Sequence, residues 1–142
     1  MMRGLSEIGD NLIAIAFESG DGRLSILRIA VVEDEESFRE SLEGLFKAVG
    51  HEVLLYLSGE DFMQSGRLAD IDCLVTDFGL TGMNGIDLLR AAHAVRPAVP
   101  VIMITARPEP SILSRALAAG AYRAFTKPVN SSELLDAVRA AK

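Results

Sequence analysis

Five short apolar runs alternate with helical patterns from residue 27 onward, and this alternation limits the fold more than any other feature of the chain. Between the runs, apolar residues repeat at intervals of three and four, which is the period of an amphipathic helix. Short connections between such elements favour parallel strands with right-handed crossovers. The chain is therefore predicted to be an α/β protein with a (βα)5 doubly wound parallel sheet. The predicted strands are 29–32, 53–57, 71–77, 100–105 and 121–126, and the predicted helices are 36–49, 59–64, 86–96, 110–119 and 131–141.

The helix predicted at 110–119 is defined by one proline and four apolar residues. Pro110 suits the first turn of a helix, where a backbone N–H has no intrahelical partner. Ile112, Leu113, Ala116 and Leu117 recur at the spacing of one helix face. All four are therefore expected to point toward the sheet.

Residues 1–26 do not fit the alternating pattern and are predicted to be an extension before the main domain at 27–142. Four leucine and isoleucine residues between positions 5 and 15 have the spacing of one helix face. The run 12–17 equally fits a strand that turns back at 19–22. Both interpretations of this extension stay open.

The composition excludes several classes of protein. The chain has 142 residues, enough for one domain with a sizeable core, and its net charge of −6 argues against direct nucleic-acid binding. No apolar run is long enough to span a membrane, and the first residues lack the pattern of a secretory signal, so a cytoplasmic protein is expected. The single cysteine, Cys73, lies inside a predicted strand and is expected to be a buried structural thiol.

Polar side chains stand at the carboxyl ends of four of the five predicted strands. Glu33 and Asp34 follow the first strand, Asp77 ends the third, Thr105 ends the fourth and Lys127 follows the fifth. In open α/β sheets, ligands bind in the crevice outside the carboxyl ends of the strands. With strands one, three, four and five adjacent, these five groups converge on one crevice. Three carboxylates repel one another too strongly to stand together without a cation, and their hard oxygen donors suit Mg²⁺.

The order of these motifs resembles the receiver domain of two-component response regulators. The acid pair after two valines, the D-x-x-L-x-G-M-N-G loop from Asp77, the Thr-Ala pair after the fourth strand and the Lys-Pro pair after the fifth all occur in order. The resemblance covers Leu27–Lys142. Residues 58–89 most resemble the FixJ subgroup, whose members often carry a DNA-binding helix-turn-helix domain after the receiver. The resemblance implies a flavodoxin-like sheet with strand order 2-1-3-4-5.

The resemblance also implies a role for each residue of the crevice. Asp77 is expected to be the phosphoacceptor, taking a phosphoryl group from a sensor histidine kinase or a phosphotransfer protein. Mg²⁺ is expected to be held by Glu33, Asp34, Asp77 and the backbone carbonyl of Gly79. Lys127 is expected to offset charge on the phosphoryl oxygens, and Thr105 to donate its hydroxyl to them. The domain is then expected to be no enzyme beyond its own phosphorylation and dephosphorylation.

Three positions depart from the family pattern. Thr81 stands where the loop usually has a proline, and Gly79 where a bulkier residue is common, so the rigidity of the loop and the lifetime of the phosphoryl group are open at this point. Ala124 stands where an aromatic switch residue is usual, and Tyr122 lies one side-chain pair farther back on the same strand face. Activation is therefore expected to act through Thr105 and the loop and helix after it. The surface formed by that helix, the fifth strand and the last helix is expected to bind a downstream partner or a second copy.

Other functions fit these residues less well. A haloacid-dehalogenase-type phosphatase needs D-x-D-x-T after a strand, and the chain has Glu33-Asp34-Glu35-Glu36 after its first strand. A nucleotide-binding domain needs a glycine-rich phosphate loop after the first strand, which the sequence does not have. Two alternatives stay open. One is a degenerate receiver that binds partners without phosphorylation, and the other is the isolated receiver of a longer DNA-binding regulator.

Overall fold

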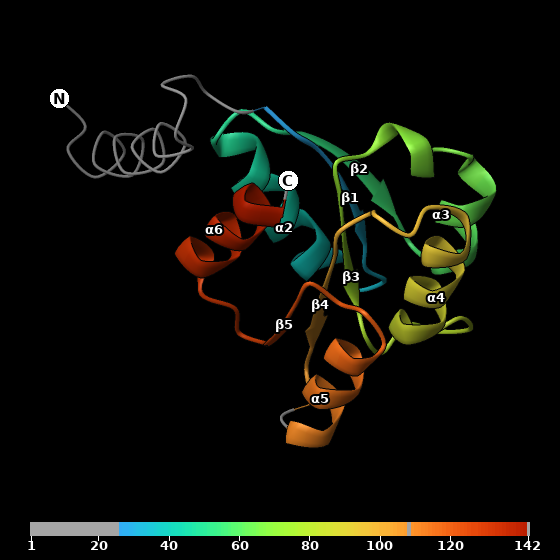
Figure 1. The fold of residues 1–142 in the computed structure, drawn as a ribbon. Helices are drawn as coiled ribbons and strands as arrows, with labels where there is room; N and C mark the ends of the chain where they lie inside the picture. Colours follow the sequence, from blue (N-terminus) through green and yellow to red (C-terminus); the bar gives the residue numbers. More distant parts are fainter. Residues whose placement is uncertain (1–25, 108, 142) are drawn as a thin grey trace, which may run out of the picture.

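The computed structural model describes residues 26–107 and 109–141. Within them, five parallel strands form one sheet in the order β2-β1-β3-β4-β5, with helices on both faces (Figure 1). The strands are β1 (Arg28–Val32), β2 (Glu52–Tyr56), β3 (Cys73–Asp77), β4 (Val101–Thr105) and β5 (Arg123–Thr126). The helices are α2 (Glu36–Ala48), α3 (Gly59–Ser65), α4 (Gly85–Val95), α5 (Pro110–Ala118) and α6 (Ser131–Ala141), with a 3-10 turn η1 (Leu68–Asp70) before β3. The predicted fold class and strand order are confirmed.

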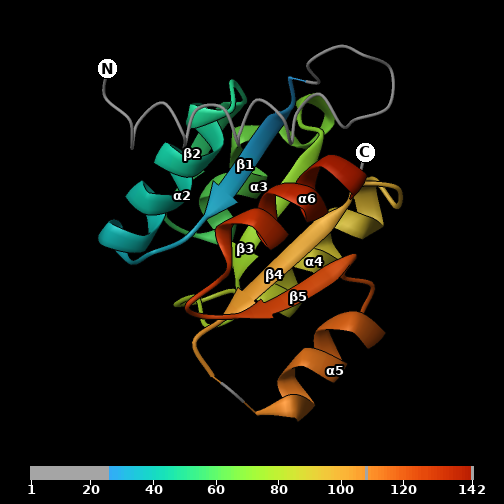
Figure 2. The ribbon, with the colours of Figure 1, turned by 90° about the vertical axis from the view of Figure 1, so that its left-hand side faces the viewer.

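The sheet is buried on both faces because its strands carry apolar side chains on both sides, as parallel sheets require. Successive side chains point to opposite faces. Ile29 and Val31 of β1 pack with α2 and α6, whereas Ala30 and Val32 pack with α3, α4 and α5. These two helical layers can be followed in Figure 2. Every residue of β3 and β4 is buried, so the site at their carboxyl ends rests on the most rigid part of the sheet.

Polar caps fix where two of the helices begin. The Ser58 hydroxyl accepts the Asp61 N–H at 3.0 Å ahead of α3, and the Asn130 side chain accepts the Glu133 N–H at 2.9 Å ahead of α6. Each bond satisfies one N–H that the first turn of a helix leaves unpaired. The two helix starts predicted from these residues are therefore confirmed.

One expectation about α5 is wrong. Ile112 and Ala116 are buried, but Leu117 is 51% exposed instead of facing the sheet. The reason is the position of α5 beside β5, the last strand at that edge of the sheet (Figure 2). Only Ile112 and Ala116 of this helix are buried there. Leu117 therefore belongs to the outer surface of α5.

The ends of the chain fall largely outside the described residues. The predicted extension, residues 1–26, is described only at Ile26, so its helical and strand interpretations stay predictions. Among the described residues, none of the helices is both long and apolar enough to cross a membrane.

Candidate functional site

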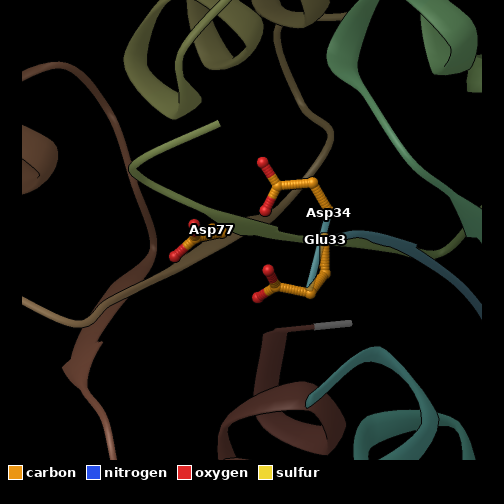
Figure 3. Close-up of side chains that lie close together, drawn as sticks. All are labelled: Glu33, Asp34 and Asp77. Atoms are coloured by element: carbon orange, nitrogen blue, oxygen red, sulfur yellow. The ribbon is translucent and has the colours of Figure 1, made fainter. Parts of the chain in front are cut away.

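Three carboxylates meet at the carboxyl edge of the sheet, where β1 and β3 lie side by side. Val32 is paired with Thr76, so the next residues along the two strands, Glu33 and Asp77, lie level with each other. Ligand oxygens of Glu33, Asp34 and Asp77 all lie within 4.8 Å of one another (Figure 3). The structure thus brings together three residues that are 44 positions apart at the extremes, as the strand-end pattern predicted.

The three acids differ in their exposure to solvent. Glu33 and Asp77 are buried, with 1% and 9% of their surface exposed, whereas Asp34 is exposed. Burial raises the pKa of Asp77, and the Asp34 charge raises it further, against the opposing effect of Lys127. Burial likewise raises the pKa of Glu33, with a further contribution from the Asp77 charge. Both shifts mean that the ionised forms of Glu33 and Asp77 are destabilised, mainly by burial and further by neighbouring negative charge.

Lys127 supplies the positive charge beside this triad. It follows β5 directly, and its backbone N–H donates to the Thr105 carbonyl at 2.8 Å. Its Nζ lies 3.0 Å from Glu33 Oε1 and 3.6 Å from Asp77 Oδ1. Burial lowers the pKa of the Lys127 ammonium, but its hydrogen bond to Glu33 and the charges of Asp77 and Glu33 outweigh this effect, so the pKa is raised overall. Lys127 therefore stays protonated.

The charge balance of the site fits a divalent cation. When ionised, Glu33, Asp34 and Asp77 carry three negative charges, and Lys127 offsets one of them. Two of the acids have raised pKa values because their charge is neither solvated nor fully compensated. Closely spaced carboxylate oxygens with one solvent-facing side are the ligands that Mg²⁺ prefers, since this ion keeps several waters.

Thr105 ends β4 on the far side of Asp77 from β1. Its side chain is 3% exposed, and its Oγ1 accepts the N–H of Arg107 at 3.0 Å. The hydroxyl is therefore engaged with the loop that follows it. Ala106, the next residue, is small and exposed.

The loop after β3 lies close against the phosphoacceptor candidate. The Gly79 N–H donates to the Asp77 carboxylate and so lowers the pKa of Asp77. At Gly85, the first residue of α4, a Cβ atom would lie 2.5 Å from the Asp77 carbonyl oxygen. Only glycine permits this approach, and the Gly85 N–H donates to the Phe78 carbonyl at 2.9 Å. The glycine-rich motif thus folds the loop back onto the end of β3.

Three residues at this site were missed by the sequence analysis as functional candidates. Lys127 Nζ lies 4.2 Å from the centre of the Phe38 ring, a cation–π contact. It also lies 3.8 Å from Glu35 Oε1. On the opposite side, Glu60 of α3 accepts the N–H of Met83 in the β3–α4 loop. The sequence could have indicated Phe38, because it lies one helical turn after the acid pair. Nothing in the sequence distinguishes Glu60 from other polar residues of a short helix.

The sequence comparisons agree on one family. The family model described as "Response regulator receiver domain" matches residues 29–139. Nodulation protein W of Bradyrhizobium diazoefficiens is 38% identical over 113 residues, which is 80% of this chain and 50% of that protein. The C4-dicarboxylate transport transcriptional regulatory protein DctR of Rhodobacter capsulatus is 36% identical over 111 residues, covering 76% of this chain and 56% of the relative. The chain therefore spans about half the length of the curated relatives it matches.

Solved structures give the same result. A receiver domain protein from Clostridium thermocellum superposes with a TM-score of 0.77 at 26% identity, covering 82% of this chain and 94% of the other. A structure of FixJ-N superposes with a TM-score of 0.73 at 29% identity, covering the same shares of the two chains. The BeF3-activated receiver domain of DrrB superposes with a TM-score of 0.76 at 26% identity, covering 82% of this chain and 97% of the other.

Proposed function

The chain belongs to the family of response regulator receiver domains of two-component systems, and on that premise we propose that Asp77 accepts a phosphoryl group in the presence of Mg²⁺. The donor is a sensor histidine kinase or a phosphotransfer protein. One observation carries the proposal. Asp77 belongs to the acid triad, lies 3.6 Å from Lys127 Nζ, and ends β3 beside β4, the strand that ends in Thr105. A nucleophilic oxygen, a metal site and a positive charge therefore occupy one place next to a hydroxyl.

Each side chain has a definite part in the transfer. A carboxylate oxygen of Asp77 attacks phosphorus, the bond from phosphorus to the donor nitrogen breaks, and the imidazole leaves with its electron pair and is protonated from solvent. Glu33, Asp34, Asp77 and the Gly79 carbonyl would hold Mg²⁺, and the bound ion would offset charge on the phosphoryl oxygens. Lys127 offsets charge on the same group from the β5 side.

Thr105 responds to phosphorylation of Asp77. In the present state its hydroxyl accepts the Arg107 N–H. The O–H of Thr105 can still donate, and a phosphoryl group on Asp77 offers it a charged acceptor, so Thr105 turns toward the phosphoryl group. The loop 106–111 follows because the Arg107 N–H is bonded to Thr105 Oγ1. Reaction at Asp77 is thereby coupled to α5 and to the surface that α5 forms with β5 and α6.

That surface is the proposed output face, for a downstream protein or a second copy of the chain. Leu117 of α5 and Tyr122 before β5 are exposed on it, at 51% and 44%. Ala124, half-buried on β5, has no side-chain rotamer to change, so the face responds through backbone movement. The domain acts on nothing but its own phosphoryl group, and it works in the cytoplasm, where such donors act.

The relatives favour one context for this output. DctR and FixJ are both named as transcriptional regulatory proteins, and this chain corresponds to about half of each. Control of transcription through a DNA-binding partner or segment is therefore the context that the comparisons support. Within it, the receiver itself contributes the switch and no direct contact with nucleic acid.

Mass spectrometry of the intact protein tests the proposal. Incubation with acetyl phosphate and Mg²⁺ is expected to add one phosphoryl group to the wild type and none to Asp77→Asn. Asp61→Asn, which changes an exposed acid on α3, is the matched control and is expected to be labelled as fully as the wild type. If Asp77→Asn is labelled as fully as the wild type, the assignment is wrong. An unlabelled wild type would favour the degenerate receiver.

A further inference from the structure

The β3–α4 loop, residues 78–84, must hold its shape if the Gly79 carbonyl is to serve the metal site. Its two ends are fixed by the backbone. The Phe78 N–H donates to the Ile104 carbonyl at 2.8 Å, and the Gly85 N–H donates to the Phe78 carbonyl at 2.9 Å. Between these points Gly79, Thr81 and Gly82 are exposed. Leu80, which lies among them, is buried in the core, so its side chain anchors the middle of the loop and the exposed residues around it depend on polar contacts for their position.

Glu60, in the first turn of α3, contacts this loop at Met83. Its Oε2 accepts the N–H of Met83 at 2.9 Å in a partly buried setting. A charged carboxylate acceptor makes this bond stronger than a bond between neutral groups. It joins two segments that are 23 residues apart in the sequence.

Gly82 makes room for this contact. A Cβ atom at Gly82 would lie 2.7 Å from Glu60 Oε2, closer than a side chain can approach. Gly82 also has a φ of 79°, in the left-handed region that glycine adopts without penalty. The loop is thus shaped to receive the Glu60 carboxylate against its backbone.

A second side-chain contact joins the loop to the acid triad itself. Thr81 Oγ1 donates to Asp34 Oδ2 at 3.4 Å, a long and weak hydrogen bond. Thr81 also lacks the fixed φ that a proline would give at this position. The firmer of these two side-chain contacts is therefore the one made by Glu60.

We propose that Glu60 is a positioning residue for the metal site: its hydrogen bond to Met83 holds the β3–α4 loop so that the Gly79 carbonyl faces Glu33, Asp34 and Asp77. This inference rests on the proposed function, because it assigns Gly79 to the Mg²⁺ site. Glu60 touches neither the metal nor the phosphoryl group. It acts through the backbone between Met83 and Gly79.

Two measurements on the whole chain test the role of Glu60. Amide hydrogen exchange without metal reports whether the loop is held, and calorimetric titration with MgCl₂ reports the affinity of the site. Glu60→Ala is expected to speed exchange at residues 79–83 and to weaken Mg²⁺ binding by about fivefold, since the net contribution of one typical hydrogen bond to holding the loop is lost. Glu60→Gln keeps an acceptor oxygen and is expected to restore most of the affinity.

Two further variants separate positioning from general stability. Asp61→Ala removes the neighbouring, exposed acid of α3 and is expected to bind Mg²⁺ like the wild type. Gly82→Ala displaces the Glu60 carboxylate and also strains the loop backbone at its φ of 79°, so it is expected to weaken Mg²⁺ binding at least as much as Glu60→Ala does. Titrations are made well below the melting temperature of each variant, so a lower stability alone leaves the affinity unchanged.

The outcomes distinguish this inference from the proposed function. A wild type that binds no Mg²⁺ overturns the metal site itself, and the role of Glu60 with it. A wild type that binds Mg²⁺, with Glu60→Ala binding equally well, overturns only the role of Glu60. Faster loop exchange in Glu60→Ala without any loss of affinity overturns it as well. Weaker binding in Glu60→Ala and Gly82→Ala, with recovery in Glu60→Gln, supports it.

Discussion

Metal-linked stability gives the sharpest test of the acid triad. The ionised carboxylates of Glu33, Asp34 and Asp77 repel one another in the folded protein, and this repulsion disappears when the chain unfolds and they separate. Mg²⁺ bound to the folded state removes the repulsion and adds binding free energy. At a hundredfold excess over its dissociation constant, a ligand specific to the folded state raises the free energy of unfolding by about 2.7 kcal/mol.

The corresponding shift in melting temperature follows from the size of the domain. The family match spans residues 29–139. With an unfolding entropy of about 2.1 cal/mol/K per residue, a domain of this length has a total of roughly 0.23 kcal/mol/K. Dividing about 2.7 kcal/mol by this entropy gives an increase of about 12 °C. Differential scanning calorimetry with and without MgCl₂ measures it, with NaCl at matched ionic strength as the control for screening.

Asp34→Ala tests whether the increase in melting temperature comes from Mg²⁺ bound at the acid triad. Asp34 is exposed, so its removal leaves no cavity in the core. The Asp34 charge also raises the pKa of Asp77, so without metal the variant is expected to be at least as stable as the wild type. Its response to Mg²⁺ is expected to be lost. A metal-induced shift of the same size in Asp34→Ala, or an equal shift produced by NaCl, would refute the reasoning.

Three further predictions follow from single sites. Gly79→Met places a side chain over the acyl phosphate, since a Cβ at Gly79 lies in ordinary contact with the Asp77 carboxylate at 3.7 Å. The variant is then expected to lose its phosphoryl group more slowly than the wild type, and equal or faster loss would contradict this. If activation acts through Thr105 and the helix after it, a phosphoryl mimic is expected to change hydrogen exchange mainly at residues 105–117. A structure of the activated form with Tyr122 moved from exposed to buried would contradict this mechanism. His51 is buried and accepts the Leu27 N–H at Nδ1, 3.0 Å away, and burial lowers its pKa below 6.5. Its contribution to stability is therefore present above pH 6.5 and is lost as the pH falls through the folded-state pKa, by at most about 1.4 kcal/mol per pH unit. Denaturant unfolding of the wild type and His51→Gln at pH 5 to 8 checks this, and a stability difference independent of pH contradicts it.

The sequence by itself determined the fold and the location of the site. Periodicity is a local property, so five apolar strands and five amphipathic helices could be placed to within about two residues, apart from the side of α5 on which Leu117 lies. Parallel connectivity then fixes which strand ends share one edge of the sheet. Glu33, Asp34, Asp77 and Lys127 could therefore be grouped before any distance was known. The chemical roles of these residues, and the boundary of the N-terminal extension, stay predictions.

Tertiary structure alone decided how those groups are held. Lys127 reaches Glu33 across 94 residues of sequence and lies over the Phe38 ring, and Glu60 reaches Met83 across 23 residues. No local pattern encodes such contacts, because they depend on the packing of helices against a twisted sheet and on side-chain rotamers. Leu117 is exposed for the same reason: the width of the buried stripe on α5 is set by the edge of the sheet and not by the helix. Short-range periodicity thus specifies which residues share one face of a helix or strand, and only packing decides how much of that face is buried and which side chains meet.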